Sequence, residues 1–174
     1  MTPEQTINQA NYIEWLKLIQ KCYLLAYVSG FIILSHILTL SGADLDSMIT
    51  IPLISVPVPR IIAVLFTLFL FWGLGVTVLV ANRKLKKIGS KLPAEIALAL
   101  RNYPSVTNGS AVFRTALFFG LFLIFLLIFY LGNKSSFNLD VLINSAVSTS
   151  PFFLAIFVGA SNKTMHRTAE AASD

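Results

Sequence analysis

Ionisable side chains inside apolar stretches are the first candidates for chemistry in this sequence. His36 lies in the outer third of an apolar run, and an ionisable group at such a place is a functional candidate by default. A proton relay or ligand site would need an acidic partner at similar depth, but none of the apolar runs contains Asp or Glu. We therefore favour a neutral His36 that is hydrogen-bonded to a Ser or Asn of a neighbouring helix.

Arg114 stands about one turn inside another apolar run. Its guanidinium could bind a lipid phosphate or the carboxylate of a partner protein. An arginine near the end of a membrane helix more often extends its head group to the interface, and we favour this interpretation.

A third candidate is a group of polar residues in the first half of the last apolar run. Asn144, Ser148 and Pro151 share one helical face by their spacing of four and three, and Ser145 and Thr149 extend it. This face could line a pore or a ligand pathway with Pro151 as a hinge. The alternative, which we favour, is hydrogen bonding between helices that holds a bundle or an oligomer together, at about 0.6–2 kcal/mol per bond.

Enzyme motifs are absent from the sequence. It contains no paired carboxylates, no Cys/His cluster, no Gly-rich phosphate loop and no nucleophile elbow, so we expect neither catalysis nor a cofactor or metal. The single cysteine, Cys22, cannot form an intramolecular disulfide, and a packing role is favoured over palmitoylation. Without a groove-reading motif, nucleic acid is not an expected partner.

The elements that carry these residues follow from composition. Hydrophobic residues make up 56% of the 174 residues and charged residues 12%, which indicates a membrane protein. Four apolar runs approach or exceed the roughly twenty residues that cross a bilayer as a helix. The sequence thus predicts an all-α membrane protein, a single domain over 1–174, with four transmembrane helices at about 18–40, 61–81, 111–131 and 141–160.

The segments outside these runs also have a pattern. Tyr12, Trp15, Leu16 and Ile19 share a face, which predicts an amphipathic helix at the membrane interface that could continue into the first span. Prolines and β-branched residues in 48–59 favour a short β-like strand or hairpin on the extracytoplasmic surface. A short helix is predicted from Leu92 to Arg101, with Pro93 in its first turn.

The distribution of basic residues predicts the orientation. Arg60 and Lys134 fall on one side of the four spans, and the other eleven of the 13 Lys and Arg residues fall on the opposite side, which is expected to be cytoplasmic together with both termini. Four of them form a dense group that we expect to contact anionic lipid or an acidic partner: Arg83, Lys84, Lys86 and Lys87.

A family resemblance comes from the Pro-rich segment. The stretch Ile51-Pro52-Leu53-Ile54-Ser55-Val56-Pro57-Val58-Pro59 before a span resembles a module of uncharacterised bacterial membrane proteins that often carry pentapeptide repeats. Leu92-Pro93-Ala94 and Tyr103-Pro104 are similar to the inner loop of that module. The likeness covers about a third of the chain, which has no such repeats. It implies a bacterial inner membrane and a scaffold role, and no activity.

Two functional classes follow from these features. The first is a non-enzymatic scaffold or sensor subunit that forms homo-oligomers or anchors a cytosolic protein through its basic inner face. The second is a small pore or transporter-like protein that uses the polar face of the fourth span. A place in bacterial stress response or phage defence would suit either class, as an expectation about small membrane proteins in general.

Overall fold

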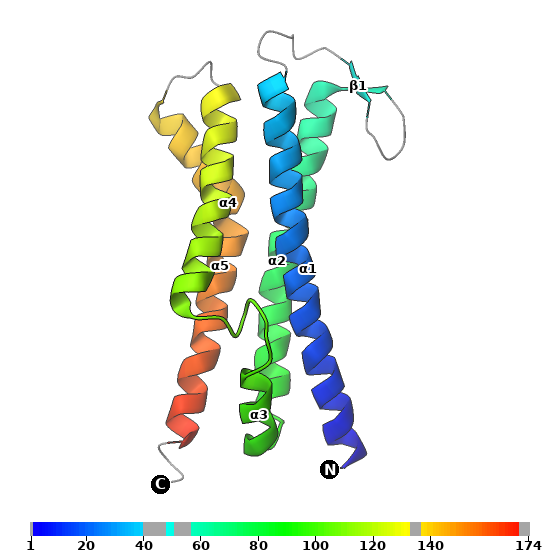
Figure 1. Ribbon diagram of the computed structural model, residues 1–174, viewed down its shortest axis with the longest axis vertical. Helices are drawn as coiled ribbons and strands as arrows, with labels where there is room; N and C mark the ends of the chain where they lie inside the picture. The colour runs from blue at the N-terminus through cyan, green and yellow to red at the C-terminus, as the bar shows by residue number, and fades with distance from the viewer. Residues whose placement is uncertain (1, 40–47, 51–56, 133–136, 171–174) are drawn as a thin grey trace.

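Four long helices form an elongated bundle in the computed structural model, which describes residues 2–39, 48–50, 57–132 and 137–170. They are α1 (Pro3–Thr39), α2 (Arg60–Gly89), α4 (Ala111–Gly132) and α5 (Leu139–Glu170), and a short α3 (Ala94–Arg101) lies at one end (Figure 1). Each of the four is long and apolar enough to cross a membrane. The prediction of an all-α protein with four such helices is confirmed.

The four helices form a ring in which α5 closes the circle. α1 packs against α2 and α4, and α5 packs against the same two helices. One end of the bundle holds α3, the start of α1 and the last turns of α2 and α5 (Figure 1). We call this the basic end, defined by the first half of α1, the last turns of α2, α3 and the 102–110 link that leads to α4.

Polar side chains mark where α1, α4 and α5 begin. The Thr2 hydroxyl accepts from the Gln5 amide at 3.3 Å and the Gln5 side chain accepts from the Thr2 amide at 2.9 Å, which is a capping box at the start of α1. Ser110 accepts from the Phe113 amide at 3.1 Å before α4, and Asn138 accepts from the Val141 amide at 3.1 Å before α5. These residues satisfy amides that would otherwise lack a partner.

Aromatic rings fill the centre of the bundle. Phe71 of α2 lies with its ring centroid 4.3 Å from that of Phe125 and 4.9 Å from that of Phe152, and Tyr23 lies 5.4 Å from Phe152. All four helices contribute one ring to this cluster, and the three Phe side chains have no exposed surface. The aromatic cluster is therefore a contact to which all four long helices contribute.

The outer surface of the bundle is apolar as well. Large apolar side chains on every long helix are more than half exposed, among them Phe31, Phe66, Phe69, Leu123 and Leu154. Water would penalise such a surface, whereas lipid acyl chains would not. The arrangement fits a bundle whose outer face meets hydrocarbon.

α1 joins the predicted interfacial segment and the first span in one helix, but the predicted interfacial face packs inside the bundle. It runs without a break over 37 residues, and the proposed interfacial face is turned inward, with Leu16 and Ile19 fully buried. Tyr12 and Trp15 are half-buried against the same core. The apolar stripe is covered by neighbouring elements of the bundle, which the sequence pattern of one helix cannot distinguish from a membrane surface.

A small antiparallel sheet lies at the other end. β1 (Met48–Thr50) pairs with β2 (Pro57–Pro59), with Met48 opposite Pro59. The strands fall in the segment for which a β-like hairpin was predicted, while 51–56 lies outside the described residues. Its position on a membrane surface stays a prediction.

Candidate functional site

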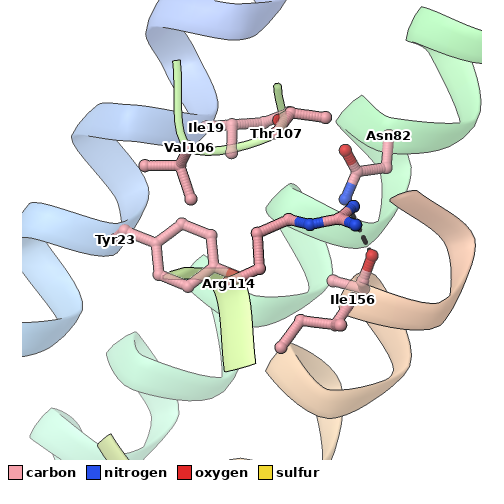
Figure 2. Close-up of a pocket in the computed structure, with 8 residues that line it drawn as sticks. Ile19, Tyr23, Asn82, Val106, Thr107, Arg114 and Ile156 are labelled. Carbon is pink, nitrogen blue, oxygen red and sulfur yellow. Dashed lines mark hydrogen bonds between the residues drawn. The ribbon is translucent and has the colours of Figure 1, made fainter. Parts of the chain in front are cut away.

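Arg114 does not extend outward but lies inside the bundle. It stands in the first turn of α4, where its amide donates to the Ser110 carbonyl at 3.1 Å, and its side chain is only 7% exposed. The guanidinium points between α2 and α5, toward Asn82 (Figure 2). The interfacial position favoured from the sequence is therefore not the one that the side chain takes.

Side chains from five segments surround this guanidinium. They enclose a small cavity of about 10 Å³, which is close to the roughly 10–15 Å³ that one water molecule requires. All four long helices and the 102–110 link contribute to its lining (Figure 2). The residues are Ile19, Tyr23, Asn82, Val106, Thr107, Arg114, Ala155 and Ile156.

Several polar atoms at this cavity have no hydrogen-bond partner. They are Nε and Nη1 of Arg114, Oδ1 of Asn82 and Oγ1 of Thr107. Asn82 is 4% exposed, and its Nδ2 donates to the Ala155 carbonyl at 3.0 Å, whereas its Oδ1 has no partner. Within the described residues no acidic side chain pairs with Arg114.

Such an arrangement is energetically unusual. A buried charge without a partner is strongly destabilising, and a buried polar atom without a hydrogen bond costs about 1–3 kcal/mol. The cavity thus combines a positive charge, one hydroxyl and one free acceptor in a confined space. It has the chemistry to bind a small polar group and no arrangement of acid, base and nucleophile.

The predicted basic group lies nearby on α2. Arg83, Lys84 and Lys87 are exposed and lie on one helical face, and we call them the basic face. Lys86 is half-buried and lies off this face. Lys86 and Lys87 also stand in the last turn of α2, where positive charge favours the helix dipole.

The polar residues of α5 do not all lie on one face. Asn144 is exposed on the outside of the bundle, whereas Ser148 and Pro151 are buried. The buried hydroxyls of Ser145 and Thr149 donate to carbonyls of their own helix, Val141 at 2.7 Å and Ser145 at 2.8 Å respectively. These two bonds lie within α5, so this part of the polar stripe does not bridge helices.

The structure adds little about the roles of His36 and Cys22. His36 belongs to α1, but its side chain lies outside the described residues. Cys22 is buried in the core. In the part of the chain that is described, no three His, Cys, Asp or Glu side chains come together as metal ligands would.

Sequence reasoning missed two residues that bring unpartnered polar atoms to the Arg114 cavity. Asn82 ends an apolar run of α2 and Thr107 lies in a link, and neither stands in a motif. An amide placed one residue after a long apolar run was the available signal for Asn82, because a polar side chain there is costly unless it is bonded.

The chain has no match among protein-family models, curated proteins or solved structures. The resemblance of the 51–59 segment to a bacterial membrane module therefore stays a prediction. The Arg114 cavity and the basic face, both at the same end of the bundle, are the features from which a function can be argued.

Proposed function

We propose that the protein is a non-enzymatic membrane scaffold that holds an acidic cytosolic partner on the basic face of α2. The observation that carries the proposal is the length of the helices. α2 has 30 residues, so it is about 45 Å long, against about 30 Å of hydrocarbon. Its last turns, with Arg83, Lys84 and Lys87, would stand beyond the bilayer.

The basic end has the packing of a folded support. Leu85 of α2, Leu92 after it and Leu100 of α3 are buried. The Asn108 side chain donates to the carbonyls of Leu100 at 2.9 Å and Tyr103 at 3.0 Å, and so joins the link to the end of α3. On a folded support, binding orders the lysine and arginine side chains but not the backbone, which lowers the entropy cost of association.

The orientation and membrane belong to the same proposal. The bias of Lys and Arg toward one side supports a cytoplasmic basic end, and the resemblance to bacterial modules supports a bacterial inner membrane. Reporter fusions at Asn102 test the orientation. An extracytoplasmic signal there would remove the basis for a cytosolic partner.

A pore through a single copy of the protein has less support than the scaffold. The aromatic cluster occupies the centre of the bundle, and the hydroxyls of Ser145 and Thr149 are bonded inside α5. Self-association through the exposed surface of α5, where Asn144 lies, remains part of the scaffold proposal.

A matched pair of variants tests the basic face. Lys84→Gln with Lys87→Gln removes two charges from it, and Lys17→Gln with Lys21→Gln removes two exposed lysines from α1 as the control. At about 1 kcal/mol per charge, the first pair should weaken attachment to an anionic surface roughly thirty-fold. The readout is the amount of crosslinked partner recovered from native membranes at rising salt, which screens exposed charges.

The expected result is a large loss of the crosslinked partner with the α2 pair, a small loss with the α1 pair and a decrease with salt for the wild type. Equal recovery from all three proteins, or recovery that salt does not change, would contradict the proposal.

A further inference from the structure

The Arg114 cavity brings together groups that nothing else in the described structure satisfies. Arg114 comes from α4, Asn82 from α2 and Thr107 from the link, and each has a buried polar atom without a partner. Two of these side chains, at 7% and 4% exposure, are more than nine-tenths buried. The folded protein holds these atoms together although burying them without hydrogen bonds is destabilising. A bound group that forms those hydrogen bonds would offset this destabilisation.

The size of the cavity limits what can enter. About 10 Å³ admits one oxygen-sized atom, and the cavity is partly open, so the rest of a larger group can lie in its mouth. Water would fit by size but would leave the guanidinium without a counter-charge. Arg114 also stands in the first turn of α4, where the helix dipole adds positive potential, so an anionic oxygen is the better occupant.

The unpartnered Oδ1 of Asn82 further limits the chemical class of the ligand. Asn82 Oδ1 repels an anion but accepts from a hydroxyl. We propose that the Arg114 cavity binds an oxyanion that also carries a hydroxyl group. The oxygen that enters the cavity is anionic and accepts from the Arg114 guanidinium and from Thr107 Oγ1, and a hydroxyl on the part of the ligand that lies in the mouth donates to Asn82 Oδ1. Dihydrogen phosphate and the headgroup of phosphatidylglycerol both have this chemistry.

Binding would connect three elements of the bundle. The ligand would link α4, the end of α2 and the 102–110 link, and so hold the basic end together. The site is separate from the basic face, because Arg83, Lys84 and Lys87 are not among the residues that line the cavity. Binding at the Arg114 cavity therefore does not depend on the scaffold proposal, and each can be tested without the other.

Thermal unfolding tests the site in protein purified in neutral detergent. Sodium phosphate is titrated against sodium chloride at equal ionic strength, because a ligand that binds only the folded state raises the Tm with its concentration. Arg114→Gln removes the charge, and Asn82→Asp supplies a carboxylate beside the guanidinium while leaving Arg114 in place. Lys21→Gln is the control for the loss of one exposed charge.

A second arm identifies the source of the oxyanion. The same proteins are placed in phosphatidylcholine nanodiscs with and without phosphatidylglycerol, and retained lipid is counted by native mass spectrometry. A Tm increase with phosphatidylglycerol alone assigns the site to a lipid headgroup, and an increase with inorganic phosphate assigns it to a free anion.

We expect the wild type and Lys21→Gln to respond to at least one of the two ligands, and Arg114→Gln and Asn82→Asp to respond to neither. Asn82→Asp keeps the test valid if Arg114→Gln does not fold. The inference is overturned if no ligand raises the Tm above the chloride control, or if Asn82→Asp responds as the wild type does.

Discussion

Gly75 is the position where the packing of α2 against α5 can be tested most directly. A Cβ at Gly75 would lie 2.7 Å from Pro151 Cβ and 3.1 Å from both Cδ2 and Cε2 of Phe152. Two residues earlier, a Cβ at Gly73 would meet nothing within 4 Å. Gly75→Ala and Gly73→Ala are therefore the same chemical change in the same helix, with and without a steric conflict.

The magnitude follows from two opposing effects. Replacing Gly by Ala in a helix interior gains up to about 1 kcal/mol of helix propensity, and this gain applies at both positions. Overpacking a filled core costs typically about 1–3 kcal/mol. The cost arises at Gly75 because Pro151 is a rigid ring and Phe152, at 0% exposure, is enclosed by Phe71 and Tyr23.

We therefore expect the free energy of unfolding of Gly75→Ala to be about 1–3 kcal/mol lower than that of Gly73→Ala. The measurement is reversible unfolding in mixed micelles at rising dodecyl sulfate fraction, followed by circular dichroism, with the wild type as reference. Equal stability of the two alanine variants would refute the close approach of α2 and α5 at this point.

Three further predictions concern other parts of the bundle. Tyr27→Phe removes the hydroxyl that donates to the Leu117 carbonyl between α1 and α4, and should lower the free energy of unfolding by about 0.5–1.5 kcal/mol in the same micelle assay. Cys22 is buried, so its alkylation by a maleimide in the folded protein should be slow and should become fast only on unfolding; rapid labelling would contradict its place in the core. In a Cys22→Ser background, Ser148→Cys should react with the maleimide only slowly in the folded protein, because Ser148 is buried; labelling as fast as in the unfolded protein would contradict its place inside the bundle.

The positions of the helices could be predicted from the sequence, and so could the ends of α4 to within one residue, but the start of α1 and the ends of α2 and α5 could not. Apolar runs of about twenty residues identify membrane-length helices, and Pro93 indicates the start of α3, which begins at Ala94. The runs end where polar residues begin, yet α1 starts at Pro3 and α2 continues to Gly89. Backbone hydrogen bonds continue through polar turns, so hydropathy locates the span and not the helix.

The candidate site was predictable only in part. Arg114 was recognisable as a charge in an apolar run. The direction of its side chain, however, depends on which residues of the other helices pack around it. Asn82 reaches the cavity from α2 and Thr107 from a link, and no spacing along the chain relates either of them to Arg114. Likewise, the sequence of α5 shows hydroxyls at Ser145 and Thr149 but not whether they bond within their helix or across to another.

The closed ring of helices has a consequence for how the protein is made. α5 leaves the ribosome last among the four long helices, yet it contacts both α2 and α4 and supplies Phe152 to the aromatic cluster. A nascent chain that holds only the first three would therefore lack the helix that closes the ring, and one side of the bundle would be open. α5 can enter the membrane before it meets them, because the hydroxyls of Ser145 and Thr149 already have partners in its own backbone. If the bundle assembles in a membrane in chain order, the docking of α5 would be the step that closes the ring, and a membrane protease could distinguish unfinished from finished molecules by whether that side is open.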